Sequence, residues 1–73
     1  MKEFNIILQC GCLYKNVKIL TENGYATNTV DVYWNLMDKG FIYVTKNIKE
    51  KPQKLKKEDI YYFCLSSNYI KKM

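Results

Sequence analysis

Short runs of β-branched, aromatic and other apolar residues, separated by turn residues and charged residues, recur along the whole of this chain. Runs of about four to eight residues in which apolar and polar positions alternate are typical of strands with one buried face. The chain has 73 residues, which is enough for one domain over residues 1–73 with a small core. We therefore expect a single β-rich domain.

The first predicted strand covers residues 4–13, an apolar segment that contains no helix start signal. Gly11 lies inside this segment, where we interpret it as a bulge or bend. The side chains that share one parity, and that we expect to form the buried face of this strand, are Phe4, Ile6, Leu8, Cys10 and Cys12.

A second predicted strand covers residues 16–22 and is followed by Asn23-Gly24. Asn-Gly between apolar runs is a strong hairpin signal, because both central positions of a type I′ turn need positive φ. We therefore predict a two-residue turn at Asn23-Gly24, in which Glu22 faces Tyr25.

Residues 29–37 are expected to form the third strand, because their β-branched and aromatic side chains crowd a helix and suit a pleated surface. In this interpretation Trp34 lies on the buried face and anchors the core, while Tyr33 lies on the opposite face. Residues 38–40 would then form a three-residue hairpin loop that leads into the next strand.

The alternative for this segment is a helix over residues 29–39, which would make the domain α+β. In that case Thr29 is the N-cap and Gly40 is the C-terminal stop. The helix would carry an apolar stripe with the spacing i, i+3, i+4 and i+7, formed by Val30, Tyr33, Trp34 and Met37.

Two further strands are predicted in the second half of the chain, over residues 41–47 and residues 60–66. Between them, residues 48–58 are interpreted as a charged loop with a short turn at its end, because Pro52 excludes a central strand. We expect the tail at residues 67–73 to fray.

Together these elements predict an all-β fold of about five antiparallel strands joined as a meander. A small sheet protects its edges best when it curls, so we expect a small barrel with a layout similar to SH3-like or Sm-like barrels. This similarity is one of architecture, and no motif in the chain indicates a particular family.

The chain carries a formal net charge of +5, and all of its 12 basic residues are lysines. Lysine attracts phosphate as a point charge, whereas arginine, which is missing, is the residue that reads guanine edges in a bidentate way. The composition therefore favours contact with nucleic acid that does not depend on sequence. A bias toward AT-rich codons explains the same positive charge without a function.

The residue composition gives little indication of catalysis or of metal binding. The chain has no histidine, and its 7 acidic residues are scattered, so no general base and no pair of nucleophile and base is evident. Cys10, Cys12 and Cys64 are an odd number of thiols, and the spacing of the first two is shorter than zinc sites use. We therefore predict a non-enzymatic protein with no cofactor and no metal.

The N-terminal residues lack the long apolar stretch of a signal peptide, and no apolar run approaches the ~20 residues that span a bilayer. Secreted domains of this size are also usually stapled by more cysteines. We therefore expect a cytoplasmic protein with reduced thiols and without a membrane partner.

The predicted binding surface combines aromatic and basic side chains. By the parity of the predicted strands, Tyr33, Phe41 and Tyr43 share the sheet face opposite Trp34, and Tyr61 extends this face. Such a face can stack unpaired bases or meet another protein. The lysines that adjoin it are Lys46, Lys49, Lys51, Lys54, Lys56 and Lys57.

We expect a small binding module that recognises nucleic acid or a nucleoprotein through this surface. The alternative is an accessory or inhibitor protein of the kind found in phages and mobile elements, which acts by binding another protein such as a nucleic-acid-processing enzyme. Self-association into a homo-oligomer, through a sheet edge or the aromatic face, is a third hypothesis.

Overall fold

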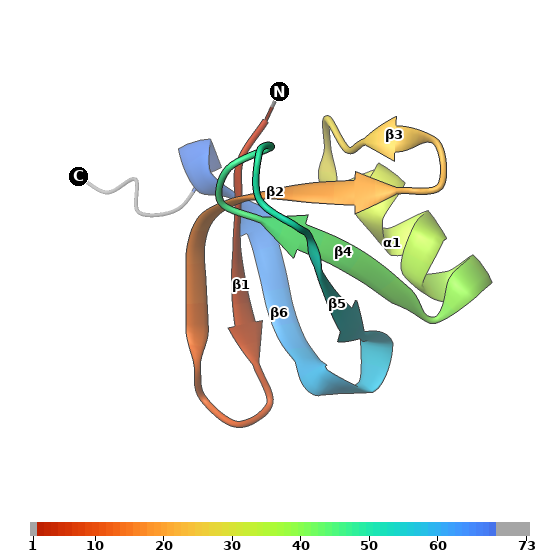
Figure 1. The fold of residues 1–73 in the computed structure, drawn as a ribbon. Helices are drawn as coiled ribbons and strands as arrows, with labels where there is room; N and C mark the ends of the chain where they lie inside the picture. Colours follow the sequence, from red (N-terminus) through yellow and green to blue (C-terminus); the bar gives the residue numbers. More distant parts are fainter. Residues whose placement is uncertain (1, 69–73) are drawn as a thin grey trace.

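The computed structural model describes residues 2–68. In these residues six strands and one α-helix follow one another, with a short 3₁₀ helix before and after the last strand (Figure 1). The strands are β1 (Phe4–Leu8), β2 (Leu13–Thr21), β3 (Gly24–Tyr25), β4 (Phe41–Thr45), β5 (Gln53–Lys56) and β6 (Ile60–Leu65). The helices are α1 (Thr29–Lys39), η1 (Lys57–Asp59) and η2 (Ser66–Asn68).

All six strands belong to one antiparallel sheet with the order β5-β4-β2-β1-β6, and β3 pairs with β2 beside this path. The first part of β2 pairs with β1, and its second part pairs with β3 and β4, so β2 joins the two halves of the sheet (Figure 1). β5 and β6 are the two ends of the order, and the sheet is open. The structure confirms a β-rich antiparallel fold but does not confirm the predicted barrel.

A bulge bends β2 where its two halves meet. The pairing of β1 with β2 changes register between Phe4 and Ile6, which leaves one extra residue in β2. Asn16 lies at this point with a φ of 55°, and its N–H donates to Oδ1 of Asn5 at 2.9 Å. Oδ1 of the buried Asn5 also accepts from Oγ of Ser66 at 2.9 Å. One buried acceptor therefore joins the bend of β2 to the end of β6.

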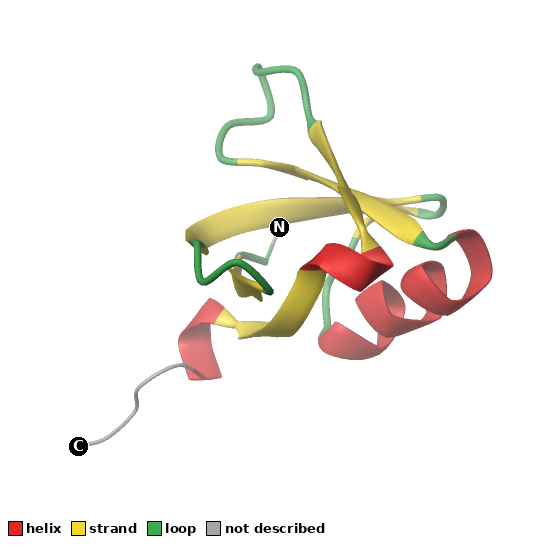
Figure 2. Ribbon diagram, turned by 90° about the horizontal axis from the view of Figure 1, so that it is seen from below, coloured by secondary structure: helices red, strands yellow, loops and turns green. Residues whose placement is uncertain are grey.

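The core lies between the bent sheet and α1, which Figure 2 shows along one side of the sheet. α1 contributes Val32 and Leu36, which lie one turn apart on the same helix face. Full burial of one such side chain stabilises a fold by about 1.5–3 kcal/mol. The buried apolar side chains are Phe4, Ile6, Val17, Ile19, Ala26, Val32, Leu36, Ile42, Val44 and Leu55.

The predicted strand over residues 29–37 is wrong, and the segment is the helix of the alternative prediction. Asn28 rather than Thr29 is the N-cap, because its extended backbone lets Oδ1 accept from the N–H of Asp31 at 2.9 Å. Gly40 ends the helix with a φ of 85°, and its N–H donates to the Leu36 carbonyl at 2.9 Å. The two caps and the burial of one helix face outweigh the β propensity of the segment.

Trp34 does not anchor the core, because it is 64% exposed. α1 buries Val32 and Leu36 against the sheet. Its larger apolar stripe faces solvent, so Val30, Tyr33 and Met37 are also more than half exposed. The predicted hairpin loop at residues 38–40 is wrong for the same reason, since these residues end α1 and lead directly into β4.

The predicted strand over residues 4–13 contains β1, a tight turn and the first residue of β2. β1 ends at Leu8, and Gly11 lies in the turn with a φ of 97°, where its N–H donates to the Leu8 carbonyl at 2.9 Å. Gly11 therefore marks a full reversal of the chain rather than a bulge or bend within one strand. Cys10 and Cys12 are exposed at this turn, which corrects their predicted place on a buried face.

The Asn23-Gly24 signal marks a hairpin with a register other than the predicted one. β2 and β3 pair Thr21 with Gly24, so the two loop residues are Glu22 and Asn23, and the predicted pairing of Glu22 with Tyr25 is wrong. Gly24 still requires glycine, because its φ of 105° is a left-handed conformation that residues with a Cβ rarely adopt.

The second half of the chain follows the prediction more closely. β4 and β6 lie within the predicted strands, and η1 is the predicted short turn. The predicted loop over residues 48–58 contains β5, which begins directly after Pro52 at the edge of the sheet, where a proline is tolerated. Of the predicted frayed tail, Ser67 belongs to η2, and residues 69–73 lie outside the described residues.

We predict that Asn5→Ala lowers the free energy of unfolding by about 1–3 kcal/mol, because the N–H of Asn16 and the hydroxyl of Ser66 lose their buried acceptor. Urea denaturation followed by circular dichroism measures this change. Asn23→Ala, in the exposed β2–β3 turn, is the control and should change the free energy of unfolding by no more than about 0.5 kcal/mol. Equal effects of the two substitutions would contradict the role of Asn5.

Candidate functional site

The structure divides the predicted binding residues between two sides of the sheet. Phe41 and Tyr43 of β4 pair with Lys56 and Lys54 of β5, and all four side chains lie on the face opposite the core. Tyr33 lies on α1, which covers the core face, so the predicted face shared by Tyr33, Phe41 and Tyr43 is wrong. The strand prediction at residues 29–37 caused this error.

Aromatic rings and lysines are interleaved on the outward side of β2, β4 and β5. We call this side the outer sheet face and define it by Lys18, Leu20, Phe41, Tyr43, Lys54 and Lys56. Phe41 and Tyr43 meet edge to face, with ring centroids 5.5 Å apart. The ammonium of Lys54 lies 4.4 Å from the centre of the Phe41 ring, a cation–π contact that covers part of this ring.

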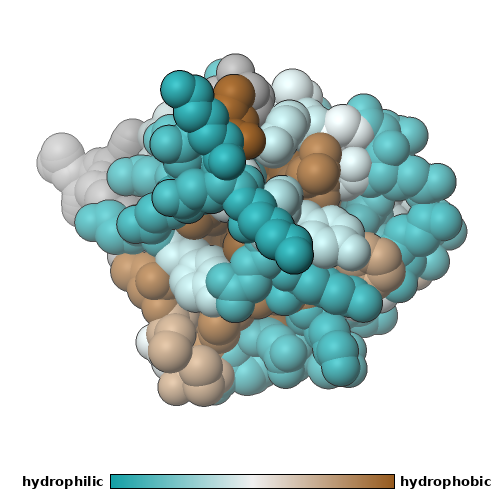
Figure 3. Space-filling model, in the orientation of Figure 1, coloured by the Kyte–Doolittle hydropathy of each residue, from teal (hydrophilic) through white to brown (hydrophobic). Residues whose placement is uncertain are grey.

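The loop between β4 and β5 carries Lys46, Lys49 and Lys51, all of which are exposed. Its start is shaped by Asn47, whose N–H donates to Oγ1 of Thr45 at 3.2 Å and whose Oδ1 accepts from the N–H of Lys49 at 3.0 Å. Figure 3 shows hydrophilic residues over β5 and this loop. The lysines of this loop therefore lie next to β5 and its Lys54 and Lys56, and their predicted role in binding stays a prediction.

An apolar surface lies over α1 and β6. We call it the helix–β6 surface and define it by Val30, Tyr33, Trp34, Met37, Tyr61 and Tyr62. These are six of the nine large apolar side chains exposed in the described part of the chain, and each is 53–70% exposed. Two neighbouring hollows lie between α1 and β6, and Tyr33 and Tyr62 line both of them. The structure thus brings the predicted Tyr33 and Tyr61 together on this surface.

Charged groups are scarce on the helix–β6 surface. Among the described residues, Lys57 of η1 is the one charged side chain that lines the two hollows. Exposed tyrosine, tryptophan and methionine with little charge between them are typical of the centre of protein–protein interfaces. Sequence reasoning missed Val30, Trp34, Met37 and Tyr62, although the helical spacing of the first three was the available signal.

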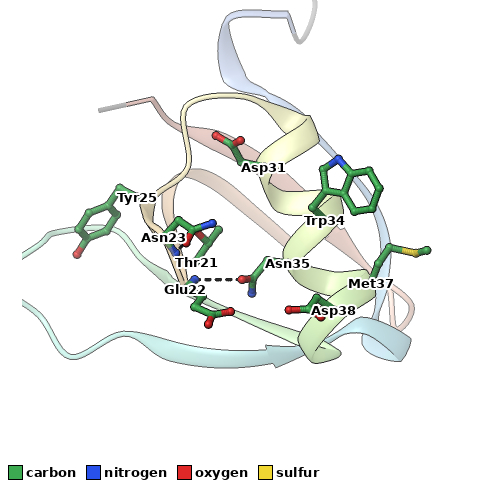
Figure 4. Close-up of a pocket in the computed structure, with 9 residues that line it drawn as sticks. All are labelled: Thr21, Glu22, Asn23, Tyr25, Asp31, Trp34, Asn35, Met37 and Asp38. Atoms are coloured by element: carbon green, nitrogen blue, oxygen red, sulfur yellow. Dashed lines mark hydrogen bonds between the residues drawn. The ribbon is translucent and has the colours of Figure 1, made fainter.

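A separate hollow with acidic walls lies between the β2–β3 hairpin and α1 (Figure 4). We call it the acidic groove. Asn35 joins its two sides, because its Oδ1 accepts from the N–H of Glu22 at 3.0 Å and its Nδ2 donates to the Phe41 carbonyl at 2.8 Å. The carboxylates that line the groove belong to Glu22, Asp31 and Asp38. None of these residues was predicted as a binding residue.

The exposed turn between β1 and β2 carries two neighbouring thiols. Hydrogen bonds from the backbone N–H and the thiol of Cys12 lower the pKa of Cys10 below the ordinary value of a thiol. The same thiol hydrogen bond raises the pKa of Cys12, its donor. Cys64 lies on β6 opposite Asn5, away from this turn. The described residues contain no group of three or more cysteine, aspartate or glutamate residues that could hold a metal ion.

No protein-family model, no curated protein and no solved structure matches this chain. Within residues 2–68, no helix has the length and apolar character that crossing a membrane requires.

We predict that iodoacetamide modifies Cys10 at lower pH than Cys12, because a lowered pKa gives more thiolate at a given pH and the thiolate is the nucleophile. As the pH rises, Cys10 ionises first, and its negative charge then disfavours ionisation of Cys12. Mass spectrometry after timed labelling over a pH series measures both rates. Identical pH profiles would contradict the prediction, and Cys12→Ala should move the profile of Cys10 to higher pH.

Proposed function

We propose that this protein is a small non-enzymatic binding module that recognises another protein through the helix–β6 surface. The observation that supports the proposal is the outward apolar stripe of α1, which adjoins the two exposed tyrosines of β6. Burial of a large apolar side chain is worth about 1.5–3 kcal/mol relative to leaving it in water, so a partner that covers several of them gains a substantial free energy. Large exposed apolar patches usually indicate such a partner.

The helix–β6 surface is held rigidly from behind, which favours tight binding. Val32 and Leu36 fix α1 on the core, and β6 is paired along its length with β1. Tyrosine and tryptophan have few rotatable bonds, so ordering them against a partner costs little conformational entropy. A standard interface buries about 800 Å² on each partner, roughly a sixth of the 4987 Å² accessible surface of this protein. One side of the molecule therefore offers enough surface for an interface of standard size.

Within this proposal, the protein is an accessory or inhibitory factor of the phage or mobile-element kind. The partner that we propose is a nucleic-acid-processing protein. Such a factor needs a rigid surface and no chemistry of its own, which agrees with a chain that lacks histidine. We also propose that it acts in the cytoplasm, where its free cysteines stay reduced.

We further propose that the bent sheet is an opened form of the small SH3-like barrel expected from the sequence. Support comes from β2, which is shared by both halves and curls the sheet around the core. α1 then takes the place of a loop between strands and covers the open side of the core.

Affinity capture from native lysate tests the protein-binding proposal. We predict that the wild-type protein retains a specific protein after nuclease treatment and at high salt, because apolar contacts are little screened by salt. Replacement of Tyr33 and Tyr61 by alanine should weaken retention at least about tenfold, since aromatic residues at an interface centre cost about 1–2 kcal/mol or more each.

The control for this experiment is Tyr43→Ala on the outer sheet face, which should leave retention unchanged. The proposal fails if the double variant retains the same protein as well as the wild type does. Light scattering at several concentrations identifies the case in which the retained protein is a second copy of this chain.

A second candidate function is binding of single-stranded nucleic acid on the outer sheet face. The observation that favours it is the pairing of Lys54 and Lys56 with Tyr43 and Phe41 on one face, next to the basic loop. Lysines neutralise phosphates and aromatic rings stack bases, which is how sheets bind single strands.

For this second function we predict that a labelled single-stranded oligonucleotide binds at low salt and is released as salt is added, with anisotropy as the readout. Lys54→Ala with Lys56→Ala should lower the slope of log K against log salt by about 0.7 for each lost phosphate contact. Lys15→Ala, at an exposed position on the half of β2 that pairs with β1, is the control and should leave the slope unchanged. No binding at low salt would exclude this function.

A further inference from the structure

One edge of β6 has no neighbouring strand, because β6 is an end strand of the sheet and pairs with β1 alone (Figure 1). Directly after β6, the N–H of Ser66 donates to the Glu3 carbonyl on the β1 side at 2.9 Å. Backbone groups of alternate residues in an antiparallel strand point to the same side, so those of Cys64 face β1 and those of Phe63 and Leu65 face away. Among the described residues, the N–H and C=O of Phe63 and the N–H of Leu65 have no hydrogen-bond partner.

The two end strands of the sheet differ in how their free edges are protected. β5 follows Pro52 and carries Lys54 and Lys56, and prolines and lysines are residues that keep the edges of natural sheets from pairing with other chains. β6 has six residues, none of which is charged or a proline. The edge of β6 is therefore a template for an added strand, whereas the edge of β5 is not.

The two hollows between α1 and β6 lie at this free edge. Tyr62, Phe63 and Cys64 line one hollow, and residues 60–63 line the other. Consecutive residues of a strand point to opposite faces of the sheet, so a space that all of them line lies beside the strand and not on one face. Because β1 occupies the other edge of β6, the hollows adjoin the unpaired backbone groups.

The two hollows follow one another along β6, and α1 forms their other wall. One is lined by Thr29 at the start of α1 and by Cys64 near the end of β6, and its volume is about 490 Å³. The other is lined by Met37 near the end of α1 and by Ile60 at the start of β6, and its volume is about 460 Å³. The helix and the strand thus enclose a groove in which successive inward side chains of an extended segment each find a hollow.

A cation without a counterion lies at one end of this groove. Lys57 of η1 lines the hollow at the start of β6, is exposed, and forms no ion pair with any described residue. The other residues that line the two hollows are uncharged. The groove is therefore complementary to a segment that is apolar along its length and carries a carboxylate at this end. A nucleic acid does not suit it, because it has no peptide groups to pair with β6.

We infer that the partner adds an extended segment to the free edge of β6, as a seventh strand in the groove between α1 and β6. The backbone of this segment bonds to Phe63 and to the N–H of Leu65, its alternate apolar side chains enter the two hollows, and an acidic residue lies beside Lys57. This inference rests on the proposed protein-binding function. It adds the conformation of the partner, since exposed side chains alone would suit a helix as well as a strand.

Amide hydrogen exchange measured by NMR on the ¹⁵N-labelled full chain tests the inference, with a peptide selected on this protein from a phage-displayed library of linear peptides as the probe. In the free protein, the amides of Phe63 and Leu65 should exchange at least about tenfold faster than that of Cys64, which bonds to β1. The bound peptide should slow exchange at Phe63 and Leu65 at least about tenfold, with a smaller change at Cys64.

Two sets of variants test the pairing and the charge. N-methylation of one peptide residue at a time should weaken binding about tenfold at alternate residues and little at the residues between them, because only every second N–H faces β6. Lys57→Gln should weaken binding of a selected peptide with an acidic residue about threefold, as loss of one exposed ion pair does. Lys49→Gln, in the loop between β4 and β5, is the matched control and should leave the affinity unchanged.

The inference is overturned if the library yields no binder, if the bound peptide leaves exchange at Phe63 and Leu65 unchanged, or if N-methylation has no period of two. Slow exchange at both amides in the free protein would also overturn it, because the edge would then be occupied by a second copy, which light scattering detects, or by the chain's own end. Its failure is distinct from that of the proposed function. If replacement of Tyr33 and Tyr61 still removes the captured protein while no strand adds to β6, the helix–β6 surface remains the interface through its side chains alone.

Discussion

The hydrogen bond between Asn5 and the backbone of Asn16 is the contact on which the architecture depends. It satisfies the N–H of a residue in a left-handed conformation and so allows β2 to bend at the bulge. The bend lets one strand serve both halves of the sheet, and the hollow between the halves is filled by Val32 and Leu36 of α1. Those two side chains fix the rotation of α1 about its axis. They therefore also determine which apolar side chains of the helix are exposed to solvent.

The three surfaces of the molecule differ in charge, and each follows from the elements that form it. β5 and the loop before it hold lysines that a solvated edge accommodates easily, whereas α1 and β6 present tyrosine, tryptophan and methionine. The acidic groove lies where the first and last turns of α1 meet the β2–β3 hairpin, and Lys39 is its internal counterion.

The sequence predicted the strands whose burial alternates, such as β4 with Ile42 and Val44. It predicted that Lys54 and Lys56 lie beside the aromatic residues of β4, but it placed them in a loop rather than in β5. It gave α1 only as the alternative to a strand, because β-branched and aromatic residues favour a strand locally. The hydrogen bonds of the Asn28 cap and the Gly40 stop favour the helix in a way that residue propensity does not describe. The error moved Trp34 into the core and Tyr33 onto the wrong face. The spacing of apolar residues shows that a helix has an apolar face. Only tertiary packing shows whether the core covers that face or, as in α1, the pair Val32 and Leu36.

The first and last strands of the described chain bring its two ends to one corner. Phe4 pairs with Leu65, and the N–H of Ser66 donates to the Glu3 carbonyl at 2.9 Å. A domain with adjacent ends can be inserted into a surface loop of a host protein, since the host loop needs to open only slightly to admit it. Tandem copies or a fused reporter would likewise leave from this corner on short tethers, with the bend of β2 undisturbed.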